Sequence, residues 1–110
     1  MLLRLILETW GHHVEEAENG QDAIGLAVTA KPDIILMDLA MPILDGFEAT
    51  RQLRAKAEFA KKPILAISAY CHGNPEVVRR ALGAGCNDCL AKPIDPDKLA
   101  TAIQQYSPHA

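Results

Sequence analysis

Apolar residues follow two patterns along the chain, and their alternation predicts an α/β domain with a parallel sheet. Short continuous apolar runs at 33–37, 63–68 and 87–91 predict strands. The run at 33–37 is apolar on both sides, so we expect helices to cover both of its faces. A shorter and poorer strand is predicted at 13–17, at an edge of the sheet, which brings the predicted strands to four.

Apolar positions at helical spacing fill the segments between these runs. Leu2, Leu3, Ile6 and Trp10 form one such stripe, which Gly11 ends. Four later helices are predicted from a polar cap at the start and a breaker at the end. They begin after Asn19 or Gly20, after Asp45, after Asn74 and after Asp95, with Pro75 and Pro96 as first helical residues. The first three stop near Lys31-Pro32, residue 56 and Gly83.

The size and charge of the chain limit the functions that it can have. The chain has 110 residues, which is enough for one small domain spanning 1–110. A net charge of −3 and few aromatic residues give no case for nucleic acid binding. No apolar stretch approaches the ~18 residues that a membrane span needs. We therefore expect a cytoplasmic protein without nucleic acid or membrane partners.

The cysteines favour a reducing compartment. Cys71, Cys86 and Cys89 are an odd number, which argues against a secreted disulfide scaffold. Cys86 and Cys89 have the spacing of a zinc or redox pair, and Cys71-His72 could complete such a site, but a single pair is a weak signal. The favoured interpretation is that all three are small apolar fillers around a strand.

Three predicted strands end in polar residues that suit phosphoryl chemistry. Asp38, Ser68 and Lys92 follow the three apolar runs, and the carboxyl ends of parallel strands lie at one edge of a sheet. Asp38 could attack a phosphoryl group, Lys92 could neutralise phosphate charge, and the Ser68 hydroxyl could donate to a phosphate oxygen. Asp45 is expected to cap a helix rather than bind metal.

Short segments around these residues occur in a characteristic order: Ala17-Glu18-Asn19-Gly20, Met37-Asp38-Leu39-Ala40-Met41-Pro42-x-x-Asp45-Gly46, Ile67-Ser68-Ala69, Gly83-Ala84-Gly85 and Ala91-Lys92-Pro93. Together they resemble the receiver domain of two-component response regulators, over nearly the whole chain. The segment from Asp45 to Arg51 is most similar to receivers of hybrid histidine kinases.

The resemblance implies a flavodoxin-like (CheY-like) doubly wound fold and a role in phosphorelay signalling rather than as an enzyme. It implies that Asp38 accepts a phosphoryl group from a histidine kinase or a phosphotransfer domain, with Lys92 and Ser68 assisting. Asp38 and the carbonyl of Ala40 would be Mg²⁺ ligands. The Lys92-Pro93 peptide is often cis in this family.

The chain departs from the family pattern at its start. It begins inside the helix that follows the first strand, so the strand and its acidic pair are not in the sequence. We expect a receiver incomplete at the N-terminus, with weakened Mg²⁺ binding and impaired phosphorylation. Either the strand at 13–17 closes up against 33–37, or an open sheet gap invites a homodimer.

A second departure concerns signal output. Cys89 stands where receivers usually carry Tyr or Phe, so aromatic switching in the usual way is not expected. The alternative function is a phosphorylation-independent pseudo-receiver that binds a partner through its last helix and strand. An enzyme acting on a small substrate is less favoured, because the loops are short and no second catalytic base is visible.

Overall fold

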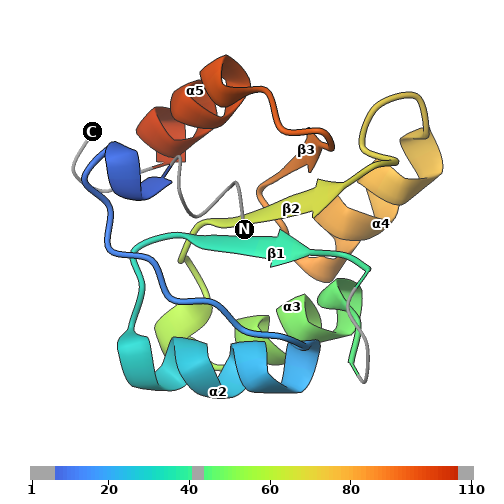
Figure 1. Cartoon of the computed structure of the whole chain (residues 1–110). Coiled ribbons are helices and arrows are strands. Elements are labelled where there is room, and N and C mark those ends of the chain that lie inside the picture. Colours follow the sequence, from blue (N-terminus) through green and yellow to red (C-terminus); the bar gives the residue numbers. More distant parts are fainter. Residues whose placement is uncertain (1–6, 41–43, 107–110) are drawn as a thin grey trace.

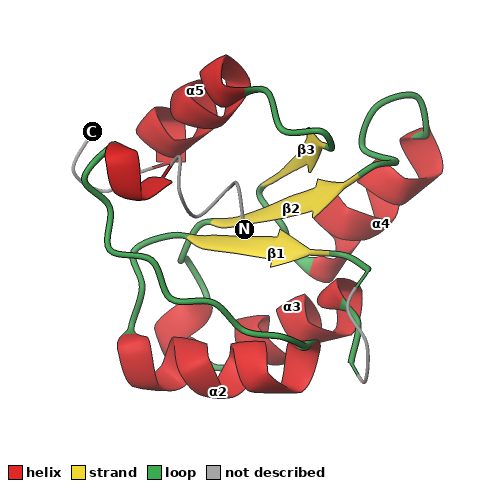
Figure 2. Cartoon of the chain, viewed as in Figure 1, coloured by secondary structure: helices red, strands yellow, loops and turns green. Residues whose placement is uncertain are grey.

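A parallel three-stranded sheet packed between helices forms the centre of the molecule (Figures 1 and 2). The computed structural model describes residues 7–40 and 44–106. The strands β1 (Ile35–Asp38), β2 (Ile64–Ser68) and β3 (Asp88–Ala91) lie in the order β1-β2-β3. The helices are α2 (Gly20–Ala30), α3 (Gly46–Arg54), α4 (Pro75–Ala84) and α5 (Pro96–Tyr106), with a short 3₁₀ turn, η1 (Ala57–Phe59).

The helices form a layer on each side of the sheet. Figure 1 shows α2, α3 and α4 on one side and α5 on the other. Every residue of the central strand β2 is buried, as expected for a strand with neighbours on both edges and helices on both faces. The core includes Met37, Leu53, Phe59 and Ile64 on the side of α3.

Local sequence signals explain where the helices begin. The side chains of Asn19, Asp45 and Asn74 accept hydrogen bonds from backbone N–H groups in the first turns of α2, α3 and α4. The predicted end of α4 at Gly83 is one residue early. The helix runs to Ala84, and Gly85 ends it with a φ of 116°, which glycine adopts without strain.

The strand predicted at 13–17 is wrong, and the described residues contain three strands rather than four. In this segment Val14 and Ala17 are half-buried and the remaining residues are exposed. A strand is held by hydrogen bonds to a neighbouring strand, and 13–17 pairs with none of the described strands. It therefore does not close up against β1.

Two other predictions are confirmed only in part. The first helix is described from Leu7 and its helical turn ends before Gly11, whereas Leu2, Leu3 and Ile6 lie outside the described residues. In β1, Met37 is buried but Ile35 and Leu36 are only half-buried. Among the described strands β1 pairs with β2 alone, so β1 is an edge strand and its residues are more exposed than those of β2.

Candidate functional site

An ion pair marks the carboxyl edge of the sheet. Asp38 ends β1, and Lys92 follows the last residue of β3. The Lys92 Nζ atom lies 2.7 Å from Oδ2 of Asp38. The Lys92 side chain is 45% exposed and the Asp38 side chain 38% exposed, so a ligand can reach both from solvent.

The second oxygen of Asp38 is also held. Oδ1 accepts a hydrogen bond of 2.9 Å from the backbone N–H of Ala40. One oxygen therefore faces an ammonium group and the other a backbone donor, which orients the carboxylate. A phosphoryl group placed on Asp38 would meet the same two donors.

Lys92 is positioned by the main chain of β2. Its N–H donates to the carbonyl of Ser68 over 3.1 Å, and the Lys92-Pro93 peptide is cis. In the register between β2 and β3, Ser68 lies opposite Ala91, the residue before Lys92. The strand end of β2 thus sets the backbone from which the Lys92 side chain reaches Asp38.

Ser68 belongs to the same edge, but its side chain contacts its own loop. Its hydroxyl oxygen accepts a hydrogen bond of 3.1 Å from the N–H of Tyr70, and its carbonyl also accepts one from Cys71. Ser68 is only 7% exposed. Tyr70 is 64% exposed, in line with a surface loop residue.

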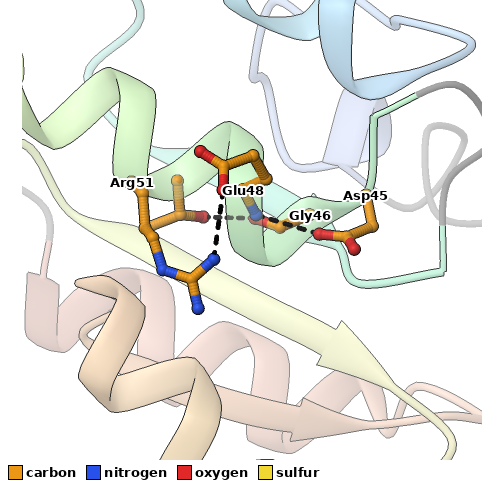
Figure 3. Close-up of polar contacts among 5 residues, drawn as sticks. Asp45, Gly46, Glu48 and Arg51 are labelled. Carbon is orange, nitrogen blue, oxygen red and sulfur yellow. Dashed lines mark hydrogen bonds and ion pairs between the residues drawn. The ribbon is translucent and has the colours of Figure 1, made fainter.

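The start of α3 supports the Asp38 loop. Asp45 accepts the N–H of Glu48 over 2.9 Å, which confirms its role as a helix cap, and Glu48 pairs with Arg51 (Figure 3). The N–H of Gly46 donates to the carbonyl of Leu39. This hydrogen bond holds the first residue of α3 against the residue that follows Asp38.

The cysteine prediction is wrong for two of three residues. Cys71 and Cys89 form a disulfide, with Cα atoms 5.5 Å apart. Cys71 lies in the turn after β2 and Cys89 in the neighbouring strand β3, and their 18-residue separation in sequence does not indicate this contact. Cys86 is a buried free thiol beside Thr50, as predicted for a small core residue, and burial raises the pKa of this thiol.

No described side chains support a zinc site. Across 7–40 and 44–106, no group of three His, Cys, Asp or Glu residues could hold a metal ion. His12 and His13 are exposed, and Nε2 of His13 lies 2.9 Å from Oε1 of Glu15.

Several features of the site carry little sequence signal. The Ala40 N–H donor and the Gly46 contact come from backbone geometry, which residue type alone does not show. The Asp-Gly pair at 45–46 is the one local hint, since a cap followed by glycine permits close approach of a helix start. Residues 41–43 of the same motif lie outside the described residues.

Comparison with known proteins identifies the family. The model of the response regulator receiver domain matches residues 1–104. The chain belongs to the response regulator receiver family. Receiver domains are signalling modules of two-component systems, so the predicted family and function class are confirmed at this level.

Individual relatives agree with this assignment. PilH of Pseudomonas aeruginosa is 42% identical over 101 residues, covering 92% of this chain and 82% of PilH. The receiver domain of sensor histidine kinase PA1611 from P. aeruginosa, solved with a magnesium ion in its active-site cleft, is 35% identical with a TM-score of 0.84, covering 96% of this chain and 84% of that one.

The fold prediction is confirmed by a third relative. The chemotaxis protein CheY4 of Vibrio cholerae has a TM-score of 0.87 at 28% identity, covering 96% of this chain and 86% of that structure. The receiver domain therefore has the predicted CheY-like α/β fold. Within the described ranges, no helix has the length and apolar character required to span a membrane.

Proposed function

We propose that this receiver domain accepts a phosphoryl group on Asp38 from a phosphohistidine of a histidine kinase or phosphotransfer domain. The observation that carries the proposal is the 2.7 Å contact between Lys92 Nζ and Asp38 Oδ2 at the carboxyl edge of the sheet. A carboxylate held beside one lysine and open to solvent is suited to phosphoryl transfer.

The residues of the site have separate tasks in this reaction. A carboxylate oxygen of Asp38 attacks phosphorus, the bond between phosphorus and the donor histidine nitrogen breaks, and the proton that returns the histidine to neutrality comes from solvent. Lys92 offsets the charge of the phosphoryl oxygens, and the Ala40 N–H orients the carboxylate. Ser68 supplies a hydroxyl once its loop moves toward the phosphoryl group.

Magnesium is the cofactor implied by the family, but the described residues fit it poorly. Asp38 and the carbonyl of Ala40 provide two oxygens, whereas Mg²⁺ prefers roughly six in octahedral geometry. No described cluster of carboxylates adds to them. We therefore propose that Mg²⁺ binds weakly here and that phosphorylation of the isolated chain is slow.

Phosphotransfer from a labelled phosphohistidine domain tests the proposal. Wild-type chain should acquire label, and Asp38→Asn should not. Asp45→Asn is the matched control, because it changes a neighbouring carboxylate that caps α3 and should leave labelling unchanged. Equal labelling of wild type and Asp38→Asn would contradict the proposal.

Other predicted properties remain proposals as well. We propose a homodimer through the edge of β1 that pairs with none of the described strands, no nucleic acid partner, no catalytic turnover of a small substrate and a cytoplasmic location. The rival function is the pseudo-receiver that binds a partner without phosphorylation. Failure of Asp38 to accept phosphate at high Mg²⁺ would favour that rival.

A further inference from the structure

A disulfide joins the loop after β2 to strand β3 next to the phosphorylation site. Cys71 lies in the turn between β2 and α4, three residues after Ser68. Cys89 lies in β3, three residues before Lys92. The covalent link therefore connects the two segments that carry Ser68 and Lys92.

The link adds to a loop that few other contacts hold. Residues 69–73 form a turn, and hydrogen bonds run from the N–H groups of Tyr70 and Cys71 to the hydroxyl and the carbonyl of Ser68. Cys89 is anchored in contrast, since it sits opposite Ala66 of β2 and packs on the core. The disulfide thus fastens the less restrained segment to the more rigid one.

Both sulfur-bearing residues are accessible to a reductant. Cys71 and Cys89 are half-buried rather than buried. Cys71 lines a surface pocket with Gly73, Pro75 and Val78, and Cys89 lines a second pocket beside α5. Accessible disulfides are the ones that exchange with thiols.

We propose that Cys71–Cys89 is a reversible redox latch on the loop that carries the Ser68 hydroxyl. A dithiol reductant would open it: one thiolate attacks a sulfur of the disulfide, the S–S bond breaks to give a mixed disulfide, and the second thiol releases the chain. Two electrons and two protons pass to Cys71 and Cys89, and the reductant becomes a disulfide. A disulfide oxidant reverses the step.

We expect opening of the latch to raise the rate of phosphorylation at Asp38, and this expectation rests on the proposed function. When it is closed, Ser68 Oγ stays engaged with the N–H of Tyr70. When it is open, residues 69–73 can move and the hydroxyl can reach a phosphoryl group on Asp38. The reduced chain should therefore be phosphorylated faster, by at least about five-fold, the lower end of typical coupling between sites.

The first part of the test does not depend on phosphorylation. The intact chain is equilibrated with dithiothreitol or with a disulfide oxidant, and its thiols are alkylated after unfolding and counted by mass spectrometry. We expect Cys71 and Cys89 to be alkylated only after reduction, and Cys86 in both states. Amide hydrogen exchange at 70 and 71 should become at least about ten-fold faster on reduction, with β2 unchanged.

Matched variants assign the effect. Cys71→Ser and Cys89→Ala should each behave as the reduced chain in either buffer, whereas Cys86→Ser should keep the full response. Unchanged exchange at 70 and 71 on reduction, or a disulfide that forms in no oxidising buffer, overturns the latch.

The second part measures phosphorylation of both redox states by one donor. A five-fold faster reaction of the reduced chain supports the regulatory role, and equal rates overturn it. If neither state is phosphorylated, the proposed function fails, and the exchange data alone then decide whether the latch exists.

Discussion

At the scale of single residues, the Asp38–Lys92 pair is better explained by chemistry than by stability. Both side chains are more than a third exposed. Ion pairs in such positions contribute only about 0–1 kcal/mol to folding. The contact instead places a fixed positive charge where a phosphoryl group on Asp38 would carry its negative charge.

Cys86 gives a pH-dependence that can be measured. Burial raises the pKa of its thiol above the ordinary value of 9.0, so the folded chain favours the neutral form. Above that value the unfolded chain loses the proton first, and the free energy of unfolding falls as pH rises. Below it both states keep the proton, and the contribution is constant.

Urea denaturation of wild type and Cys86→Ala between about pH 7 and pH 10.5 checks this, under oxidising conditions that keep Cys71 and Cys89 paired. The stability of wild type relative to Cys86→Ala should be constant up to about pH 8.5 and decrease above it. Curves that stay parallel up to pH 10.5 would show that the thiol ionises equally in both states.

Some contacts of the site follow from the sequence pattern and others depend on the path of a single turn. Asp38, Ser68 and Lys92 could be placed at one edge because each follows an apolar run, and parallel strands share that edge. The Ser68–Tyr70 contact and the Cys71–Cys89 disulfide could not be predicted, because both depend on the path of one turn after β2.

At the scale of elements, Arg54 at the end of α3 connects three segments. Its Nε donates to the carbonyl of Gly85, and Nη1 donates to the carbonyls of Phe59 and Lys62. Nη2 donates to Oδ1 of Asn87 over 2.8 Å. Removal of the guanidinium leaves the part-buried carbonyls of Gly85, Phe59 and Lys62 without this donor, whereas Oδ1 of Asn87 still accepts from the N–H of Ile64.

We therefore expect Arg54→Met to lower the free energy of unfolding by about 2–4 kcal/mol. Arg51→Met is the matched control on the same helix, because Arg51 is exposed and its ion pair is with Glu48, one turn earlier in α3. Its effect should stay within about 0.5 kcal/mol. Similar losses in the two variants, measured by urea denaturation, would refute the bridging role of Arg54.

The close approach of α3 to β1 requires a glycine at 46. A methyl group there would lie 2.8 Å from Cα of Leu39 and closer still to the carbonyl oxygen of Asp38. Since both neighbours are backbone, Gly46→Ala must displace the loop that follows Asp38. We expect a loss of about 1–3 kcal/mol and slower phosphorylation of Asp38.

Gly83→Ala is the control for this substitution. A methyl group at 83, in the solvent-exposed part of α4, has no atom within 4 Å. Alanine favours helix over glycine, so this variant should be as stable as wild type or up to about 1 kcal/mol more stable. Thermal melts of both variants test this, and a melting temperature of Gly46→Ala equal to that of wild type would contradict the predicted steric clash.

Local signals set the element boundaries that could be predicted. Asn19, Asp45 and Asn74 cap their helices as expected, because a cap needs only its own first turn. The prediction of a strand at 13–17 is wrong because a strand needs a hydrogen-bonded neighbour, which the sequence of the segment alone does not reveal.

At the scale of the whole molecule, the outer edge of β1 is the feature that bears on assembly. The N–H of Ile35 donates to the carbonyl of Pro63, just before β2, and the N–H of Leu39 donates to Ile67 of β2. Because backbone groups alternate along a strand, those of Leu36 point away from β2. Edge strands of this kind can pair with another chain. Among the described strands, none occupies that edge.

Sedimentation analysis over a range of concentrations tests the proposed homodimer. Wild type should show a monomer–dimer equilibrium, and Leu36→Pro should shift it to monomer, because proline removes one outward N–H and spares the bonds to β2. Circular dichroism checks that the variant folds. A wild-type chain that is monomeric at every concentration, or a dimer that Leu36→Pro leaves intact, would contradict pairing through β1.

The overall architecture could be predicted further than its details. Three apolar runs and the capped helices between them specify a parallel α/β sheet, and the family comparison agrees. The half-buried state of Ile35 and Leu36 could not be predicted, since it depends on which neighbours flank β1.

The central claim is that Asp38 carries the phosphoryl group, and peptide mapping tests it most directly. The intact chain is incubated with a small phosphodonor at high Mg²⁺, the acyl phosphate is trapped by borohydride reduction, and the modified residue is located by mass spectrometry. We predict modification at Asp38 in wild type and none in Asp38→Asn. Modification of a different residue, or an unmodified Asp38 at saturating donor, would contradict the account.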